Sequence, residues 1–324
     1  MIPDILILAQ EGTANTSPAA QALVTGLSLG SIYALLAMGF VIIFKATQVL
    51  NFAHGALAAL GAFLVALFAT VWDIPQRWLP DWPAWITWTI SVTFALVAAA
   101  LVGMALERVF IRPMVGEELF AVAIVTLGID IALRTVTNDF IGTDSRPLGD
   151  PWGTGVFDLG WVRIAHTEVV QLAVTIVLVL LVALFFRTRT GTAMRATAFD
   201  QEAARAQGVD VGRIFGVAWA IGAVLATVGG IFLSVFPRRG AGLDTQTAFF
   251  VFAAFPAIIL GGLDSVVGAV VGGMIIGMAQ AYASLLPFEW LGTGFAGVLP
   301  YFIMMFVLLI RPYGLFGTEE IRRV

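Results

Sequence analysis

Long apolar runs with almost no charge, separated by short charged clusters, constrain this chain more than any other sequence feature. A helix needs about 20 apolar residues to cross a bilayer core about 30 Å thick. Each run predicts one membrane-inserted helix, because backbone polar groups in lipid must bond within their own segment. The runs are approximately Ala19–Phe44, Phe52–Val71, Ile86–Leu106, Leu119–Leu133, Val169–Phe186, Ile214–Phe236, Thr247–Leu263, Ser265–Leu286 and Gly294–Ile310.

The predicted fold is therefore an all-α polytopic membrane protein with about eight to ten transmembrane or half-membrane helices. Only 12% of the 324 residues are charged, against roughly a quarter in a soluble domain, which excludes a soluble enzyme. The fourth run carries Asp130, and Asp264 alone separates the seventh run from the eighth, so these runs are candidates for half-helices. The stretches Asn51–Gly61 and Gly261–Gly273 each place small residues after a polar break. This likeness predicts an inverted repeat, with two broken helices around a central pathway.

The distribution of cations predicts the orientation, because Lys and Arg near helix ends tend to stay in the cytoplasm. Alternate loops place eleven of the 17 cations on one side: Lys45, Arg108, Arg112, Arg187, Arg189, Arg195, Arg205, Arg213, Arg311, Arg322 and Arg323. We therefore expect the N-terminus outside and the C-terminus inside. Residues 1–18 would form an extracytoplasmic segment and residues 19–310 the transmembrane domain. A cytoplasmic loop is expected at 187–213, and a cytoplasmic tail at 311–324.

Composition excludes several kinds of site. The chain has no cysteine, so thiolate metal sites and cysteine nucleophiles are excluded. His54 and His166 lie in different segments, and we expect no metal and no cofactor. The single lysine, Lys45, follows Phe44 rather than glycine, so no Walker A loop can form and ATP hydrolysis would take place on a partner chain. The net charge of -4, without a basic run, argues against nucleic-acid binding.

The largest inner loop, residues 187–213, differs from the others because its middle is rich in helix-forming residues. Asp200 and Glu202 suit the beginning of a helix, and Gly208 can end it in a left-handed turn. A short surface helix is predicted here. It is either a solvated connector or a coupling element, and Glu202-Ala203-Ala204 followed by Gly208 matches the EAAxxxG pattern of ABC-transporter permeases.

With that loop included, nearly the whole chain resembles one family, the permease subunits of branched-chain amino acid ABC transporters, of the LivH type. The motifs, in order, are Gly30-Ser31-Ile32-Tyr33-Ala34-Leu35, Asn51-Phe52-Ala53-His54-Gly55, Glu107-Arg108 with Arg112-Pro113, Thr126-Leu127-Gly128, Gly261-Gly262-Leu263-Asp264-Ser265 with Gly268 and Gly272-Gly273, and Arg311-Pro312-Tyr313-Gly314-Leu315-Phe316-Gly317. Each motif is weak alone, whereas their order and spacing together are specific. The chain departs from the family pattern at Asp264, where glycine is usual, and at Asp130, where a small or apolar residue is usual.

The resemblance implies a permease subunit of an ATP-driven importer in a bacterial inner membrane, which is not itself an enzyme. Its implied cargo is branched-chain amino acids, with other amino acids, urea or short amides as related cargoes. Its implied partners are two cytoplasmic ABC ATPases, a second homologous permease and an extracytoplasmic binding protein. The residues expected to couple to the ATPase are Gly191, Arg195, Glu202, Ala203, Ala204 and Gly208. The candidates for the translocation path are Asn51, His54, Gly55, Thr126, Gly128, Gly261, Gly262, Asp264 and Ser265.

Polar residues at membrane depth leave alternatives open. Asn51 and His54 either cap a helix near the headgroups or line the path. Asp130 and Arg134, four residues apart, either form an ion pair or place a proton-relay carboxylate in an ion-coupled secondary transporter. The glycines from Gly261 to Gly277 either pack helices tightly or expose broken backbone to a cavity. A membrane-embedded enzyme would need a catalytic constellation that the sequence does not supply.

Overall fold

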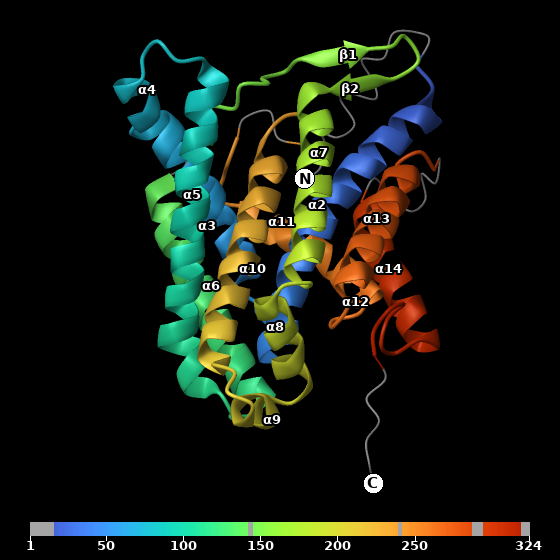
Figure 1. The fold of residues 1–324 in the computed structure, drawn as a ribbon. Helices are drawn as coiled ribbons and strands as arrows, with labels where there is room; N and C mark the ends of the chain where they lie inside the picture. Colours follow the sequence, from blue (N-terminus) through green and yellow to red (C-terminus); the bar gives the residue numbers. More distant parts are fainter. Residues whose placement is uncertain (1–15, 142–144, 239–241, 287–293, 319–324) are drawn as a thin grey trace.

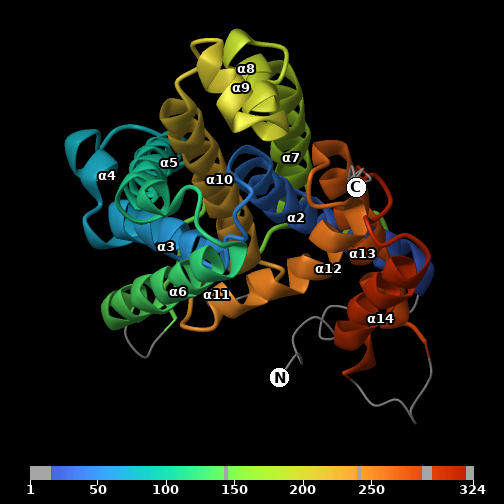
Figure 2. The same cartoon turned by 90° about the horizontal axis from the view of Figure 1, so that it is seen from below.

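Helix α2 (Pro18–Thr47) lies at the centre of the computed structural model, which describes residues 16–141, 145–238, 242–286 and 294–318. Pro18 suits the first turn of a helix, where an N–H has no partner to lose. Every residue from Ser28 to Ile43 is buried, as expected of a helix that is apolar on all sides. Figure 2 shows α2 between α10 (Val211–Ser234) and α13 (Val266–Ala283).

The remaining elements are mostly apolar helices that run along the same bundle (Figure 1). In chain order they are α3 (His54–Ala66), which continues through a π-helical turn at Leu67–Val71, α4 (Ile74–Trp78), α5 (Ala84–Leu106), which continues through a π-helical turn at Glu107–Ile111 and a 3-10 turn at Arg112–Met114, α6 (Leu119–Ile141), β1 (Val156–Asp158), β2 (Arg163–Ala165), α7 (His166–Phe185), α8 (Arg189–Phe199), α9 (Gln201–Ala206), α11 (Thr247–Phe250), a 3-10 turn at Val251–Ala254, α12 (Phe255–Gly261) and α14 (Phe295–Ile310).

The all-α membrane fold predicted from the apolar runs is confirmed. Seven helical segments of the described part are long and apolar enough to span a membrane, and two shorter apolar segments, Thr247–Gly261 and Phe295–Ile310, complete the set. One predicted boundary was wrong: the fourth segment does not end at Leu133, because α6 continues to Ile141. Arg134 lies inside this helix, where it pairs with Asp130 at 3.2 Å. The loop between α6 and α7 adds a small antiparallel hairpin, β1–β2, which the sequence did not predict.

The elements divide between two ends of the bundle. Figure 1 shows α8 and α9 at one end and α4 with the β1–β2 hairpin at the other. The first described residues join the hairpin end, since Ser17 N donates to the carbonyl of Trp161. The last described residues join the α12 end, where Thr318 N donates to the carboxylate of Asp264. The described chain therefore begins and finishes at opposite ends of the bundle.

Close packing of α2 on α13 forms the most extensive helix contact in the described structure. The contact depends on glycines on both helices: a Cβ at Gly277 would meet the backbone of Gly30, and a Cβ at Gly30 would meet the backbone of Met274. Small residues on facing helices allow this approach within a membrane. The glycines of α13 thus pack helices tightly, and the chain also breaks between Gly261, where α12 ends, and Val266, where α13 begins. Helices α5, α6, α7 and α14 present exposed apolar side chains, as lipid-facing helices do.

Candidate functional site

The 187–213 loop folds into two short helices, α8 and α9, where the sequence predicted one. Thr188 caps α8 by accepting a hydrogen bond from Gly191 N at 3.2 Å. Asp200 ends α8 in an extended conformation, and its carboxylate accepts hydrogen bonds from Glu202 N and Ala203 N, both at 2.9 Å, so it caps α9. The predicted helix is therefore divided by its own N-cap residue, since an Asx cap requires non-helical backbone.

The end of α9 is confirmed at Gly208, which has a φ of 82°. Val209 N donates to the carbonyl of Ala204 and Gly208 N to that of Arg205, which together make a Schellman cap. No atom lies within 4 Å of the position that a Gly208 side chain would take, so the requirement for glycine here is conformational.

The six predicted coupling residues divide into an anchored set and an exposed set. Gly191 and Ala204 are buried, whereas Arg195, Glu202, Ala203 and Gly208 are exposed. A Cβ at Gly191 would meet the carbonyl of Phe185, so this glycine holds α8 against the end of α7. The sequence did not single out Phe199, whose side chain is 94% exposed at the junction of α8 and α9. An apolar side chain this exposed, on a segment rich in charge, is a candidate contact for a partner protein.

Three translocation-path candidates, Asn51, His54 and Thr126, lie where the segment between α2 and α3 contacts α6. Thr126 of α6 donates to the carbonyl of Leu50 at 2.9 Å, and Phe52 N donates to the Thr126 hydroxyl at 3.3 Å. These bonds hold Asn51, which is fully buried, and His54, whose Nε2 lies 3.0 Å from the carbonyl of Leu36.

This polar cluster lies within the membrane-spanning part of the fold. Leu36 is nine residues before Lys45 on α2, which at 1.5 Å per residue is about 13 Å along the helix. Of the two alternatives for Asn51, the structure does not show the helix cap, because α3 begins after Ala53 without a side-chain cap. Both side-chain polar atoms of Asn51 and the Nδ1 of His54 are buried without a hydrogen-bond partner among the described residues.

Asp130 of α6 is paired. Asp130 forms the ion pair with Arg134, and the Arg134 guanidinium lies 4.4 Å from the centre of the Phe249 ring. Of the other candidates nearby, Gly55 is buried and would place a Cβ against the carbonyl of Ala248. Gly128 is different, since it is exposed and has open space beside it. It does not join the cluster of Asn51, His54 and Thr126.

The second group of path candidates, residues 261–265, lies between α12 and α13 and contacts the segment that follows α14. Leu315 N donates to the carbonyl of Leu260, and Phe316 N to that of Gly261. Gly262 has a φ of 105°, and a Cβ there would meet the backbone of Gly317. The carbonyl of Asp264 accepts a hydrogen bond from Lys45 Nζ at 2.8 Å, while Ser265 caps α13 through Gly268 N. The structure thus does not bring this group together with Asn51.

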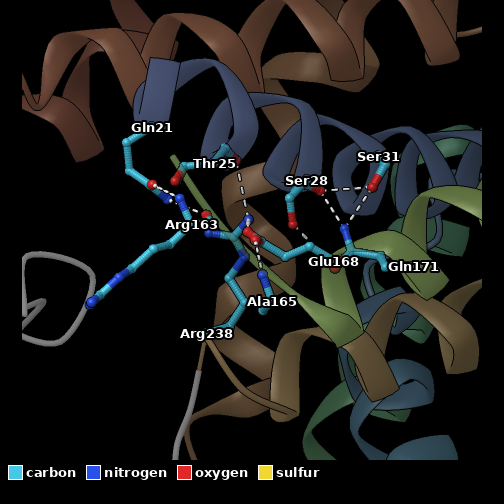
Figure 3. A network of polar contacts seen from close by, with 9 residues as sticks. All are labelled: Gln21, Thr25, Ser28, Ser31, Arg163, Ala165, Glu168, Gln171 and Arg238. Atoms are coloured by element: carbon cyan, nitrogen blue, oxygen red, sulfur yellow. Dashed lines mark hydrogen bonds and ion pairs between the residues drawn. The ribbon is translucent and has the colours of Figure 1, made fainter. Parts of the chain in front are cut away.

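A pocket at the opposite end joins residues that the sequence did not connect (Figure 3). Its volume is about 260 Å³, and it lies between the beginning of α2, the hairpin, the first turn of α7, the 236–238 segment and the end of α13. Glu168 and Arg238 line it, and each side chain is 6% exposed. Burial lowers the pKa of Arg238 from its usual range. Gln21, Glu168 and Arg238 are far apart in sequence, so only tertiary packing could reveal this cluster.

Hydrogen bonds fix the surroundings of this pocket. The amide of Gln21 donates to the carbonyl of Arg163 and accepts from its N–H, both at 3.0 Å. One turn deeper, the Gln171 side chain bonds to Ser28 and Ser31 of α2. These contacts attach α7 and the hairpin to α2. Three of the cations used to predict the orientation lie outside the described residues: Arg239, predicted to be outside, and Arg322 and Arg323, predicted to be inside. The described residues also do not include 1–15 and 319–324.

Comparison with known proteins supports the motif-based expectations. Residues 22–308 match the model of a family described as the permease component of branched-chain amino acid transport systems. The chain is 29% identical over 317 residues to LivH of Escherichia coli K12, a high-affinity branched-chain amino acid transport system permease protein, covering 94% of this chain and 97% of LivH. It is 28% identical over 312 residues to BraD of Pseudomonas aeruginosa, with the same coverage. A solved structure, PsaBC from Streptococcus pneumoniae in complex with Fab, matches with a TM-score of 0.44 and 16% identity over 95% of each chain.

Proposed function

We propose, from the premise that this chain belongs to the branched-chain amino acid transport system permease family, that it carries branched-chain amino acids into a bacterial cell. As a member of that family it is a multi-pass membrane permease of an ABC importer, and not an enzyme or an ion-coupled transporter. ATP hydrolysis belongs to a partner ATPase, and an importer of this family also works with a substrate-binding protein.

The proposed assembly contains two cytoplasmic ATPases, a second homologous permease and one extracytoplasmic binding protein, in the inner membrane. The end carrying α8, α9 and the tail faces the cytoplasm, and the hairpin end faces outside. The charge distribution supports this orientation. Lys45 in the last turn of α2, Arg112 after α5, Arg187 before α8 and Arg311 after α14 join the further arginines of the α8–α9 segment, whereas Arg77, Arg146, Arg163 and Arg238 belong to the segments at the hairpin end. Cations near helix ends favour the cytoplasmic side.

The observation that carries the proposal is the geometry of the α8–α9 segment. It protrudes at one end of the bundle (Figure 1), is anchored through Gly191 and Ala204, and presents Glu202, Ala203 and the 94% exposed Phe199. Its N-caps and its Schellman cap give it a defined shape before any partner binds. We propose that it docks on the ATPase and transmits the difference between the nucleotide-bound and nucleotide-free states.

The proposed translocation path passes the polar cluster of Asn51, His54, Gly55 and Thr126. Buried polar groups without partners are costly in a membrane, and they are expected where a path or its waters pass. Gly128 would face lipid or the second permease. For Gly261, Gly262, Asp264 and Ser265 we propose a role in attaching the broken helix to the tail, so that movement of α13 reaches the inner end.

Transport in proteoliposomes tests the proposal. The chain is reconstituted with the ATPase, second permease and binding protein encoded beside it, and labelled leucine uptake is measured with and without ATP. We expect uptake that needs ATP and stops when the ATPase is omitted. Uptake driven by a proton gradient without ATP would contradict the proposal. ATP-driven uptake of urea or another amino acid, but not of leucine, would contradict the proposed cargo alone.

A further inference from the structure

The pocket at the hairpin end contains a buried ion pair whose hydrogen bonds are incomplete. Arg238 Nη2 lies 3.9 Å from Glu168 Oε1, which is beyond hydrogen-bond distance. The same Nη2 donates to the carbonyl of Thr25 at 3.1 Å. Arg238 Nε is buried and has no hydrogen-bond partner among the described residues. Glu168 Oε2 accepts a hydrogen bond from Ala165 N at 3.1 Å, while Oε1 is the carboxylate oxygen nearest the guanidinium.

A buried charge pair whose hydrogen-bonding capacity is not used up by protein groups favours a polar ligand beside it. A guanidinium offers five donors, and a carboxylate about four acceptor positions. Leaving such groups without partners away from water destabilises the fold. A ligand that carried one negative and one positive group on the same carbon atom would supply partners for both side chains.

We infer that this pocket binds the head group of a zwitterionic α-amino acid, with its carboxylate on Arg238 and its ammonium on Glu168. The rest of the lining is mixed. Apolar side chains come from Ala22, Val156, Phe236, Ala281 and Leu285, and polar ones from Thr16, Gln21, Thr25, Thr154, Arg163 and Ser284. Its volume of about 260 Å³ suits one small molecule with a short aliphatic side chain. The site lies at the end of the bundle opposite α8 and α9, where substrate would enter.

The choice of an amino acid and the position of this site on the entry side rest on the proposed function. The site itself differs from the polar cluster of Asn51, His54 and Thr126, which the path candidates form nearer the inner end. A substrate leaving a binding protein would therefore meet the Glu168–Arg238 pocket before it reached that cluster.

Direct binding to the assembled complex tests the inference. The permease–ATPase complex is placed in lipid nanodiscs without ATP and without the binding protein, and L-leucine is titrated by calorimetry. Leucinamide, which lacks the carboxylate, and 4-methylpentanoate, which lacks the ammonium group, are titrated in parallel. We expect saturable binding of leucine, and binding at least about tenfold weaker for each analogue, because each leaves one buried charge without its partner. Absence of leucine binding, or equal binding of all three compounds, would overturn the inference.

Variants locate the binding. Arg238→Gln and Glu168→Gln each leave one uncompensated charge, so the double variant, which removes both charges, guards against a variant that fails to fold. Arg77→Gln is the matched control, since Arg77 is an exposed cation of α4 at the same end, outside the pocket. We expect the double variant to lose leucine binding by about tenfold or more, and Arg77→Gln to retain it. Unchanged binding in a folded double variant would overturn the inference.

ATP-driven leucine uptake by the same preparations separates this inference from the proposed function. If the unaltered complex transports leucine but does not bind it in the absence of the binding protein, the pocket is not a substrate site and the importer assignment stands. If leucine binds in the pocket but is not transported, the inference stands and leucine is not the cargo.

Discussion

The Arg112 guanidinium donates two hydrogen bonds to the buried carboxylate of Glu107, at 3.0 and 2.8 Å, and a third to the carbonyl of Gly212 at 2.7 Å. Glu107 belongs to the turn after α5, whereas Gly212 lies in the first turn of α10. The same arginine thus satisfies a buried charge and joins the segment that follows α9 to the membrane bundle. This contact therefore links the beginning of α10, which follows α8–α9, to the end of α5.

Replacing Arg112 with alanine is expected to destabilise the fold. The Glu107 side chain is 1% exposed and would lose its cation. We expect a loss of about 3 kcal/mol, the lower end of the range for breaking a buried pair, because 40% of the Arg112 side chain is exposed. Thermal unfolding in detergent measures the loss. Arg108→Ala, which removes an exposed neighbouring cation, is the control. Equal stability of the two variants would contradict the role of the pair.

Phe199→Ala should weaken coupling without weakening the fold. Phe199 is almost fully exposed, so its removal leaves no cavity, whereas an aromatic contact at an interface contributes about 2 kcal/mol or more. We expect the ATPase to bind more than about tenfold more weakly, with unchanged thermal stability of the permease. Phe120→Ala, at another exposed phenylalanine, on the apolar surface of α6, is the matched control. Normal ATPase affinity in Phe199→Ala would remove Phe199 from the proposed interface.

Gly277→Leu should separate α2 from α13. The added side chain would meet the backbone of Gly30, and backbone atoms cannot move aside as a flexible side chain can. Overpacking of this kind costs about 1–3 kcal/mol or more, so we expect a low yield of folded protein in the membrane. Gly128→Leu, where nothing lies within 4 Å, should fold normally. A normal yield of Gly277→Leu would show that the helices tolerate a wider spacing.

The sequence predicted the membrane helices well because the cost of burying charge in lipid acts on every residue of a span. The apolar pattern does not predict the end of α6, because a charged residue such as Arg134 after an apolar run indicates a loop. In the structure Asp130 and the ring of Phe249 accommodate that charge. The division of α8 from α9 follows from the local chemistry of Asp200. The preference of aspartate for the N-cap position is visible in the sequence, but the pattern of helix-forming residues predicts one continuous helix.

Long-range contacts could not be predicted from one sequence. Glu168 and Arg238 are 70 residues apart, and nothing in the local pattern of either connects them. The contact of the 261–265 loop with the tail similarly depends on α12 and α14 finishing at the same end. The polarity of Asn51 and His54 at membrane depth indicates a functional role from the sequence alone. Their association with Thr126, through the Leu50 carbonyl, required the fold.

Gly208→Pro and Glu202→Lys should both disturb ATPase coupling while membrane insertion stays intact. Proline cannot adopt the φ of 82° at Gly208 and has no N–H for the bond to Arg205. Lysine at position 202 reverses a charge on the exposed face of α9, near the positive end of the helix. Substrate-stimulated ATP hydrolysis is the measurement. Gly116→Pro is the control, since Gly116 also has a positive φ and open surroundings but lies outside α8–α9. Unchanged stimulation in both variants would contradict the coupling role.

Cross-linking from α9 tests the central claim most directly. Because the chain has no cysteine, a photoactivatable group can be attached at a single introduced thiol. The group is placed on Ala203→Cys, on the exposed face of α9, and separately on Asp158→Cys, in the exposed hairpin at the other end. In the assembled complex we predict a cross-link to the ATPase from position 203 and none from position 158. A cross-link from position 158, or none from position 203 in a complex that hydrolyses ATP, would contradict the account.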